Sequence, residues 1–91
     1  MNVHPSENPT ELIRLRVASL HSQITEDMLR SIFEPFGKID NVQLIMDVDT
    51  GRSKGYGFIT FHNVDEGKVA MNQLNGFELA GLPLKIDIAT E

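Results

Sequence analysis

Two kinds of apolar spacing alternate along this chain, and their order constrains the fold more than any other feature. Four segments carry apolar residues at every second position, which is typical of strands with one buried side. These segments are residues 12–18, 42–46, 54–61 and 84–88. Two intervening segments, residues 25–36 and 63–74, have the spacing of amphipathic helices. The predicted order is strand, helix, strand, strand, helix, strand.

This order is that of the split βαβ, or ferredoxin-like, layout. Because crossover connections are right-handed, both helices are expected on one face of the sheet. The sequence therefore predicts an α+β domain over residues 12–91, a βαββαβ sandwich with a four-stranded antiparallel sheet and two helices on one face. Residues 1–11 are polar and contain two prolines, so they are predicted to be a disordered leader. The opposite face of the sheet is expected to be open to solvent.

Residues that favour helix ends support both predicted helices. Thr25 is expected to cap the first helix, and Pro35 and Gly37 are expected to end it. Asn63 is expected to cap the second helix. Gly67, inside that helix, is expected to weaken it by about 1 kcal/mol relative to alanine. The expected core comprises Ile13, Leu15, Val17, Met28, Leu29, Ile32, Phe33, Phe36, Val42, Leu44, Met46, Ile59, Phe61, Val64, Val69, Ala70, Leu74, Leu84, Ile86 and Ile88. A short hairpin is considered for residues 77–83.

Length and composition exclude several classes of protein. The 91 residues fit one domain. The absence of cysteine excludes a disulfide scaffold, a thiolate metal site and a cysteine nucleophile. The histidines lack the spacing of metal ligands, and no catalytic constellation is recognisable. We therefore expect no enzymatic activity, cofactor, metal or membrane partner, and a monomeric isolated domain.

The net charge argues at first against nucleic acid. It is -5, from 8 Lys+Arg and 13 Asp+Glu, whereas nucleic-acid binding favours basic surfaces. The predicted faces change this interpretation, because basic residues gather on the open face. The acidic residues assigned to the helical side are Glu26, Asp27, Glu34, Asp65 and Glu66, and Glu7 lies in the leader. The basic residues of the open face and its rim are Arg14, Arg16, Arg52, Lys54 and Lys85, with Asp87 as the main acid among them.

The third predicted strand carries the most specific motif. Ile59 is expected in the core, so Tyr56 and Phe58 point to the open face. The octapeptide Lys54 to Phe61 fits K/R-G-F/Y-G/A-F-V-x-F/Y, with Ile59 in the place of Val. This is the RNP1 signature of the RNA-recognition motif, or RRM. The chain resembles RRM domains over residues 12–90, and the segments ITEDMLRSIFEPFG, DTGRSKGYGFITF and QLNGFELAG are similar to the second RRM of the CAPER family of splicing coactivators.

The resemblance implies a binding mode without catalysis. Tyr56 and Phe58 match the RNP1 aromatic residues that stack on bases or insert between sugars, and Lys54 matches the basic residue that pairs with a phosphate. It also implies single-stranded RNA as the ligand, splicing proteins as further partners, and location in the nucleus.

The first strand departs from the RRM pattern. Its RNP2 hexamer runs from Leu15 to Leu20 and has Arg16 where an aromatic residue is usual. Arg16 either stacks its guanidinium on a base or grips a phosphate, or the domain has lost part of its affinity for RNA. Arg14 and Lys85 are further candidates on the open face, together with Gln43 for a base edge and Arg52 for a phosphate.

The alternative is a protein-interaction RRM that binds a partner peptide through its acidic helical face. One such subclass, the U2AF-homology type, uses an Arg-x-Phe motif after the second helix. The corresponding position reads Phe77-Glu78-Leu79, and the missing arginine disfavours that subclass.

Overall fold

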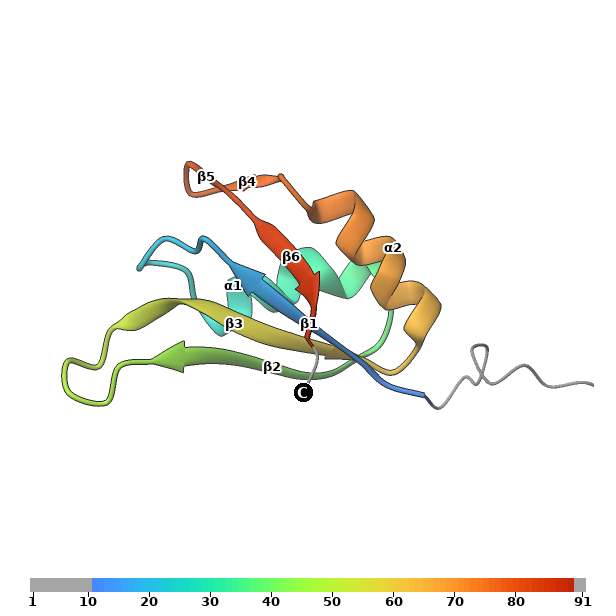
Figure 1. Ribbon diagram of the computed structural model, residues 1–91, viewed down its shortest axis with the longest axis horizontal. Helices are drawn as coiled ribbons and strands as arrows, with labels where there is room; N and C mark the ends of the chain where they lie inside the picture. The colour runs from blue at the N-terminus through green and yellow to red at the C-terminus, as the bar shows by residue number, and fades with distance from the viewer. Residues whose placement is uncertain (1–10, 90–91) are drawn as a thin grey trace, which may run out of the picture.

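The computed structural model describes residues 11–89 (Figure 1). The predicted leader therefore lies outside the described residues except for Glu11. The elements are β1 (Ile13–Ala18), α1 (Glu26–Phe33), the 3-10 helix η2 (Glu34–Phe36), β2 (Ile39–Met46), β3 (Ser53–Phe61), α2 (Val64–Leu74), β4 (Glu78–Leu79), β5 (Leu82–Pro83) and β6 (Lys85–Ile88). The predicted order is confirmed, and β4 and β5 form the short hairpin between α2 and the last strand.

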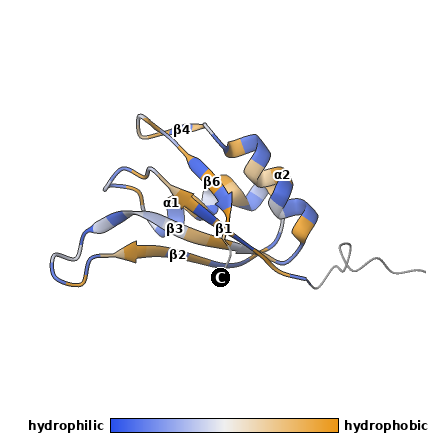
Figure 2. Cartoon of the chain, in the orientation of Figure 1, coloured by the Kyte–Doolittle hydropathy of each residue, from blue (hydrophilic) through white to orange (hydrophobic). Residues whose placement is uncertain are grey.

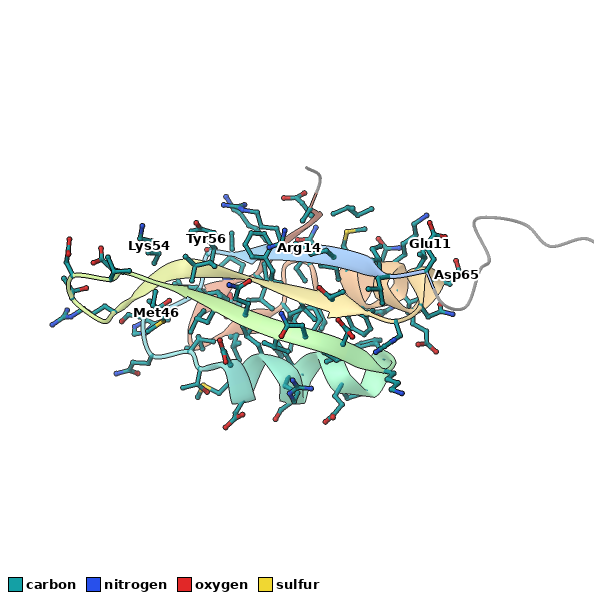
Figure 3. All side chains as sticks on the ribbon, turned by 90° about the horizontal axis from the view of Figure 1, so that it is seen from below. Glu11, Arg14, Met46, Lys54, Tyr56 and Asp65 are labelled. Carbon is teal, nitrogen blue, oxygen red and sulfur yellow. The ribbon has the colours of Figure 1, made fainter. Side chains whose placement is uncertain are left out.

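The main sheet has four strands in the order β2-β3-β1-β6, and every neighbouring pair is antiparallel. Helix α1 packs against β2, and α2 packs against β1 and β3. Figures 1 and 3 show that the helices cover one face of this sheet and leave the other uncovered. The predicted ferredoxin-like α+β fold is therefore confirmed. Within residues 11–89, no helix has the length and apolarity that crossing a membrane would require.

The core lies between the sheet and the helices, and most predicted core residues occupy it. Leu15, Ile59 and Phe61 are fully buried on the sheet, and Leu29 and Phe33 are fully buried on α1. The rings of Phe33 and Phe61 lie 6.3 Å apart between their centroids, which joins α1 to the central strand. Figure 2 shows hydrophilic and hydrophobic residues alternating around α2, as expected for a helix with one buried side.

Four predicted core residues are instead substantially exposed, and all four predictions were wrong for local reasons. Met28 lies in the first turn of α1, where its sulfur accepts the backbone N–H of Thr25 at 3.4 Å. Val69 is exposed because Ala70 provides the buried contact on that part of α2. Met46 follows a register irregularity at the end of β2, and Ile88 ends an outer strand. Their exposed fractions are 46 % for Met28, 50 % for Val69, 45 % for Met46 and 42 % for Ile88.

Helix α1 begins at the predicted cap, and a short 3-10 turn follows its last residue. Thr25 caps the helix, its hydroxyl accepting the Met28 N–H at 3.2 Å. The α-helix ends at Phe33, but the chain continues as η2, which contains Pro35 and is followed by Gly37. The α-helix thus ends before Pro35, and Gly37 is the C-cap of the 3-10 turn that follows, so the predicted end of the helical segment is confirmed.

Helix α2 begins at the predicted cap, where the Asn63 side-chain oxygen accepts the Glu66 N–H at 2.9 Å. Gly67, predicted as a weakness, is buried against β1. A methyl group at this position would collide with Cγ2 of Ile13. The glycine therefore lets α2 approach the sheet closely, which its helix propensity alone does not reveal.

The two outer strands are each contacted by a side chain from another part of the fold. The carboxylate of Glu26, at the start of α1, accepts the Leu44 N–H of β2 at 2.9 Å. The side-chain oxygen of Asn75, which follows α2, accepts the Ile86 N–H of β6 at 3.0 Å. These two bonds tie the ends of the helices to the edges of the sheet.

Candidate nucleic-acid interface

The register of the sheet arranges the open face in rows that cross the strands. Phe58 on β3 lies opposite Gln43 on β2 and opposite Arg16 on β1. Arg16 lies in turn opposite Asp87 on β6. Gln43, Phe58, Arg16 and Asp87 therefore form one row across all four strands, which no segment of the sequence shows by itself.

A neighbouring row places Tyr56 opposite Ala18, and Ala18 opposite Lys85. On the other side of the first row, Arg14 lies opposite Thr60. Figure 3 shows Lys54, Tyr56 and Arg14 on the side of the sheet that faces away from α1.

Gly57 sets the spacing beneath the two aromatic residues. It is buried opposite Leu44, and a Cβ atom there would lie 2.5 Å from the backbone oxygen of Gln43. Only glycine permits β2 and β3 to approach this closely at that position. The rings of Tyr56 and Phe58 are thus carried on a strand held tightly against its neighbour.

The two aromatic rings form an edge-to-face pair. Their centroids lie 5.9 Å apart, and their planes are inclined by 86°, an arrangement that aromatic quadrupoles favour. Both residues are half-buried. The open face therefore carries a packed aromatic pair that the helices do not cover.

Each ring also carries an arginine from β1. The guanidinium carbon of Arg14 lies 3.9 Å from the centroid of Phe58, and that of Arg16 lies 5.0 Å from the centroid of Tyr56. Each arginine reaches past its direct partner on β3, which is Thr60 for Arg14 and Phe58 for Arg16. Each contacts the ring two residues earlier on that strand. The small side chain of Ala18, opposite Tyr56, leaves room for Arg16 to lean this way. Planar guanidinium groups favour such stacking on aromatic faces.

The loop between β2 and β3 holds Arg52 at the edge of this face. The Asp47 carboxylate accepts the N–H groups of Asp49 at 2.8 Å and Thr50 at 3.1 Å. The Asp47 N–H donates to the Arg52 carbonyl at 2.7 Å. The loop conformation is therefore defined by hydrogen bonds, and the Arg52 side chain is exposed.

Within residues 11–89, no carboxylate lies within 4.0 Å of a lysine or arginine side-chain nitrogen of the open face. In that range, the one contact within this distance between a basic and an acidic side chain joins Nε2 of His62 to Oδ1 of Asp40 at 3.2 Å, and it involves none of the predicted RNA-contact residues. Asp87 lies opposite Arg16 in register, yet Arg16 rests over Tyr56. In the same described range, no cluster of acidic or histidine side chains could hold a metal ion.

The structure brings the predicted site residues together on one surface. Arg14, Arg16, Gln43, Tyr56, Phe58 and Lys85 lie on the sheet face, with Lys54 at the start of β3 and Arg52 in the loop. Sequence reasoning missed Ala18 and the pairing of each arginine with a ring. The available signal was a small residue, Ala18, between Arg16 and Leu20. That Ala18 lies opposite Tyr56 follows only from the cross-strand register.

Comparisons with known proteins agree with this geometry. A family model described as RNA recognition motif matches residues 15–85. The human protein "Probable RNA-binding protein 23" is 65 % identical over 79 residues, which cover 87 % of this chain and 18 % of that protein. This similarity agrees with the resemblance to the CAPER family. The human "Poly(U)-binding-splicing factor PUF60" is 40 % identical over 73 residues, which cover 80 % of this chain and 13 % of that protein.

Solved structures show the same fold. The second RRM domain of the yeast poly(U)-binding protein Pub1 superposes with a TM-score of 0.81 at 33 % identity, covering 87 % of this chain and 95 % of that chain. The RRM of Rna15 with bound RNA (GU) gives 0.77 at 29 % identity, covering 86 % of this chain and 83 % of that chain. The chain thus spans less than a fifth of the length of these two human proteins, but it matches nearly all of the isolated Pub1 domain. It belongs to the RNA recognition motif family.

Proposed function

We propose that this domain binds single-stranded RNA on the open face of its sheet, without catalysis. Tyr56 and Phe58 stack on bases or sugars, and the surrounding cations contact phosphates. Arg16 takes the place of the usual RNP2 aromatic residue, and Gln43, beside Phe58 in the same row, reads the edge of a base. The observation that carries this proposal is the aromatic pair on the sheet face that the helices leave open. Its ring centroids lie 5.9 Å apart, and the neighbouring cations have no ion-pair partner within residues 11–89.

The relatives support a role in RNA processing. PUF60 is named as a poly(U)-binding splicing factor, and the Rna15 domain was solved with RNA bound. We infer that this domain is part of a pre-mRNA splicing factor in the nucleus, with other splicing proteins as partners. The isolated domain is expected to be monomeric.

The first prediction tests the aromatic pair. Tyr56→Ala and Phe58→Ala are each expected to weaken the binding of a labelled single-stranded RNA, because base–aromatic stacking contributes about 1–3 kcal/mol per base. This corresponds to a loss of roughly 5- to 150-fold in affinity. Fluorescence anisotropy with an oligouridine and with a random-sequence pool measures the loss, and circular dichroism verifies that the variants remain folded.

Phe77→Ala is the matched control. Phe77 is a 46 % exposed aromatic residue outside the four-stranded sheet, so its truncation should leave the RNA affinity unchanged. Full affinity in both sheet variants, or no binding of either RNA by the unaltered domain, would contradict the proposal.

The alternative to RNA binding is recognition of a partner peptide by the acidic helical face. Two acidic side chains of that side already have structural contacts, since Glu26 accepts a β2 N–H and Glu66 packs against Gly37. An NMR titration separates the two functions: RNA should shift the resonances of Arg16, Tyr56 and Phe58. Shifts confined to the helices with an arginine-rich peptide, and none with RNA, would favour protein recognition.

A further inference from the structure

One face of the Phe58 ring is covered by a guanidinium in the free domain. The guanidinium carbon of Arg14 lies 3.9 Å from the ring centroid, which is the separation of atoms in van der Waals contact. Phe58 also packs against Tyr56 in the T-shaped pair. A base that stacks on the covered face of Phe58 must therefore displace the guanidinium.

Nothing else in the described structure holds Arg14 in this place. Its direct cross-strand partner is Thr60, so the side chain reaches Phe58 along a diagonal. Within residues 11–89, no carboxylate lies within 4.0 Å of its guanidinium. Arg14 is exposed, so a displaced side chain has free space to move into.

Arg16 provides a comparison on the same face. Its guanidinium carbon lies 5.0 Å from the Tyr56 ring, which is farther than the 3.9 Å contact at Phe58. Phe58 is therefore the ring with the closer guanidinium contact.

We propose that Arg14 is an internal competitor for the stacking face of Phe58. In the free domain its guanidinium lies on the ring. When a base takes that place, the guanidinium moves away and contacts a phosphate of the same RNA. This inference rests on the proposed function, because it describes how the same face exchanges an intramolecular contact for an RNA contact.

The Arg14→Lys variant separates competition for the Phe58 ring from the attraction of the positive charge to a phosphate. Lysine keeps the positive charge for a phosphate, but it is a compact, strongly hydrated cation and stacks less well than a planar guanidinium. Loss of the stacked competitor should therefore increase RNA affinity by about two- to fivefold, the size expected for an exposed cation–π contact. Unchanged or weaker binding would overturn the proposal, because the guanidinium would then be no competitor. Arg30→Lys, on α1, is the matched control and should leave the affinity unchanged.

Arg14→Gln tests the second half of the exchange. If the displaced guanidinium contacts a phosphate, its loss should reduce the slope of log affinity against log salt by about 0.7, the value for one contact with single-stranded nucleic acid. The Arg14→Lys variant should retain the original slope. An unchanged slope in Arg14→Gln would overturn the movement of Arg14 to a phosphate.

NMR of the Arg14 side chain distinguishes failure of this inference from failure of the proposed function. In the free domain, the ring current of Phe58 should shift the Arg14 δ-proton resonances upfield, and Phe58→Leu should abolish this shift. Saturation with oligouridine should return the resonances toward ordinary values. Resonances that stay shifted in the saturated complex would overturn the competition. A domain that shows the upfield shift and binds no RNA would instead refute the proposed function on which the inference depends.

Discussion

At the scale of single residues, position 16 decides how far this domain departs from other RRMs. An aromatic residue there would stand opposite Phe58 in the central row of the open face. Arg16 instead extends over Tyr56, so it presents a planar cation beside the aromatic pair. The proposed consequence is partial compensation for the missing ring.

Replacing Arg16 with tyrosine tests this compensation. Because arginine already offers a stacking plane and a charge, Arg16→Tyr is expected to raise RNA affinity by less than about fivefold. An uncompensated loss of about 1–3 kcal/mol of stacking would make the gain larger. Isothermal titration calorimetry with the same oligouridine measures the difference. A gain of tens of fold would show that the arginine compensates for nothing.

The outward direction of Tyr56 and Phe58 could be predicted at this scale, because period-two alternation fixes the two faces of a strand once Ile59 is assigned to the core. The contacts between the arginines and the rings could not be predicted. They depend on which residues of β1 and β3 lie opposite each other, and on a diagonal lean that local sequence does not specify.

At the scale of elements, Gly67 shows how packing overrides helix propensity. Propensity predicts that Gly67→Ala stabilises α2 by about 1 kcal/mol. The collision with Ile13 predicts the opposite sign, because overpacking a core costs about 1–3 kcal/mol. We expect Gly67→Ala to lower the free energy of unfolding, as measured by urea denaturation.

A double-mutant cycle identifies the cause. Ile13→Ala removes the colliding methyl group, so Gly67→Ala should be less destabilising, or stabilising, in that background. Equal effects of Gly67→Ala in both backgrounds would show that the contact with Ile13 is not responsible.

The helix caps could be predicted from local sequence, whereas some core positions on the helices could not. Thr25 and Asn63 act on backbone groups only three residues away, so the sequence contains both partners of each contact. Met28 and Val69 were assigned wrongly because apolar spacing defines a helix face without giving the angle at which the helix meets the sheet.

At the scale of the whole molecule, the uneven distribution of charge makes the proposed RNA binding compatible with an acidic domain. The net charge is -5, yet Arg14, Arg16, Lys54 and Lys85 gather on or beside the open sheet face, with Arg52 in the adjacent loop. Long-range attraction should therefore be weak, and short-range stacking and a few phosphate contacts should provide most of the affinity.

This distribution predicts a shallow dependence on salt. Up to five phosphate contacts, each contributing about −0.7, give a slope of log affinity against log salt no steeper than about −3.5. Anisotropy titrations between low and physiological salt measure this slope. A steeper value would require cations beyond those of the open face and its rim.

The bonds made by Glu26 and Asn75 have a consequence for self-association. Outer strands commonly pair with a strand from another chain through their unpaired backbone groups, which leads to sheet extension or aggregation. Here the N–H groups of Leu44 and Ile86, one on each outer strand, already donate to side chains. A second copy, or an extended peptide, would have to displace these side chains before adding a strand at either position. The fold thereby disfavours strand addition at these two positions and leaves the face of the sheet free for its ligand.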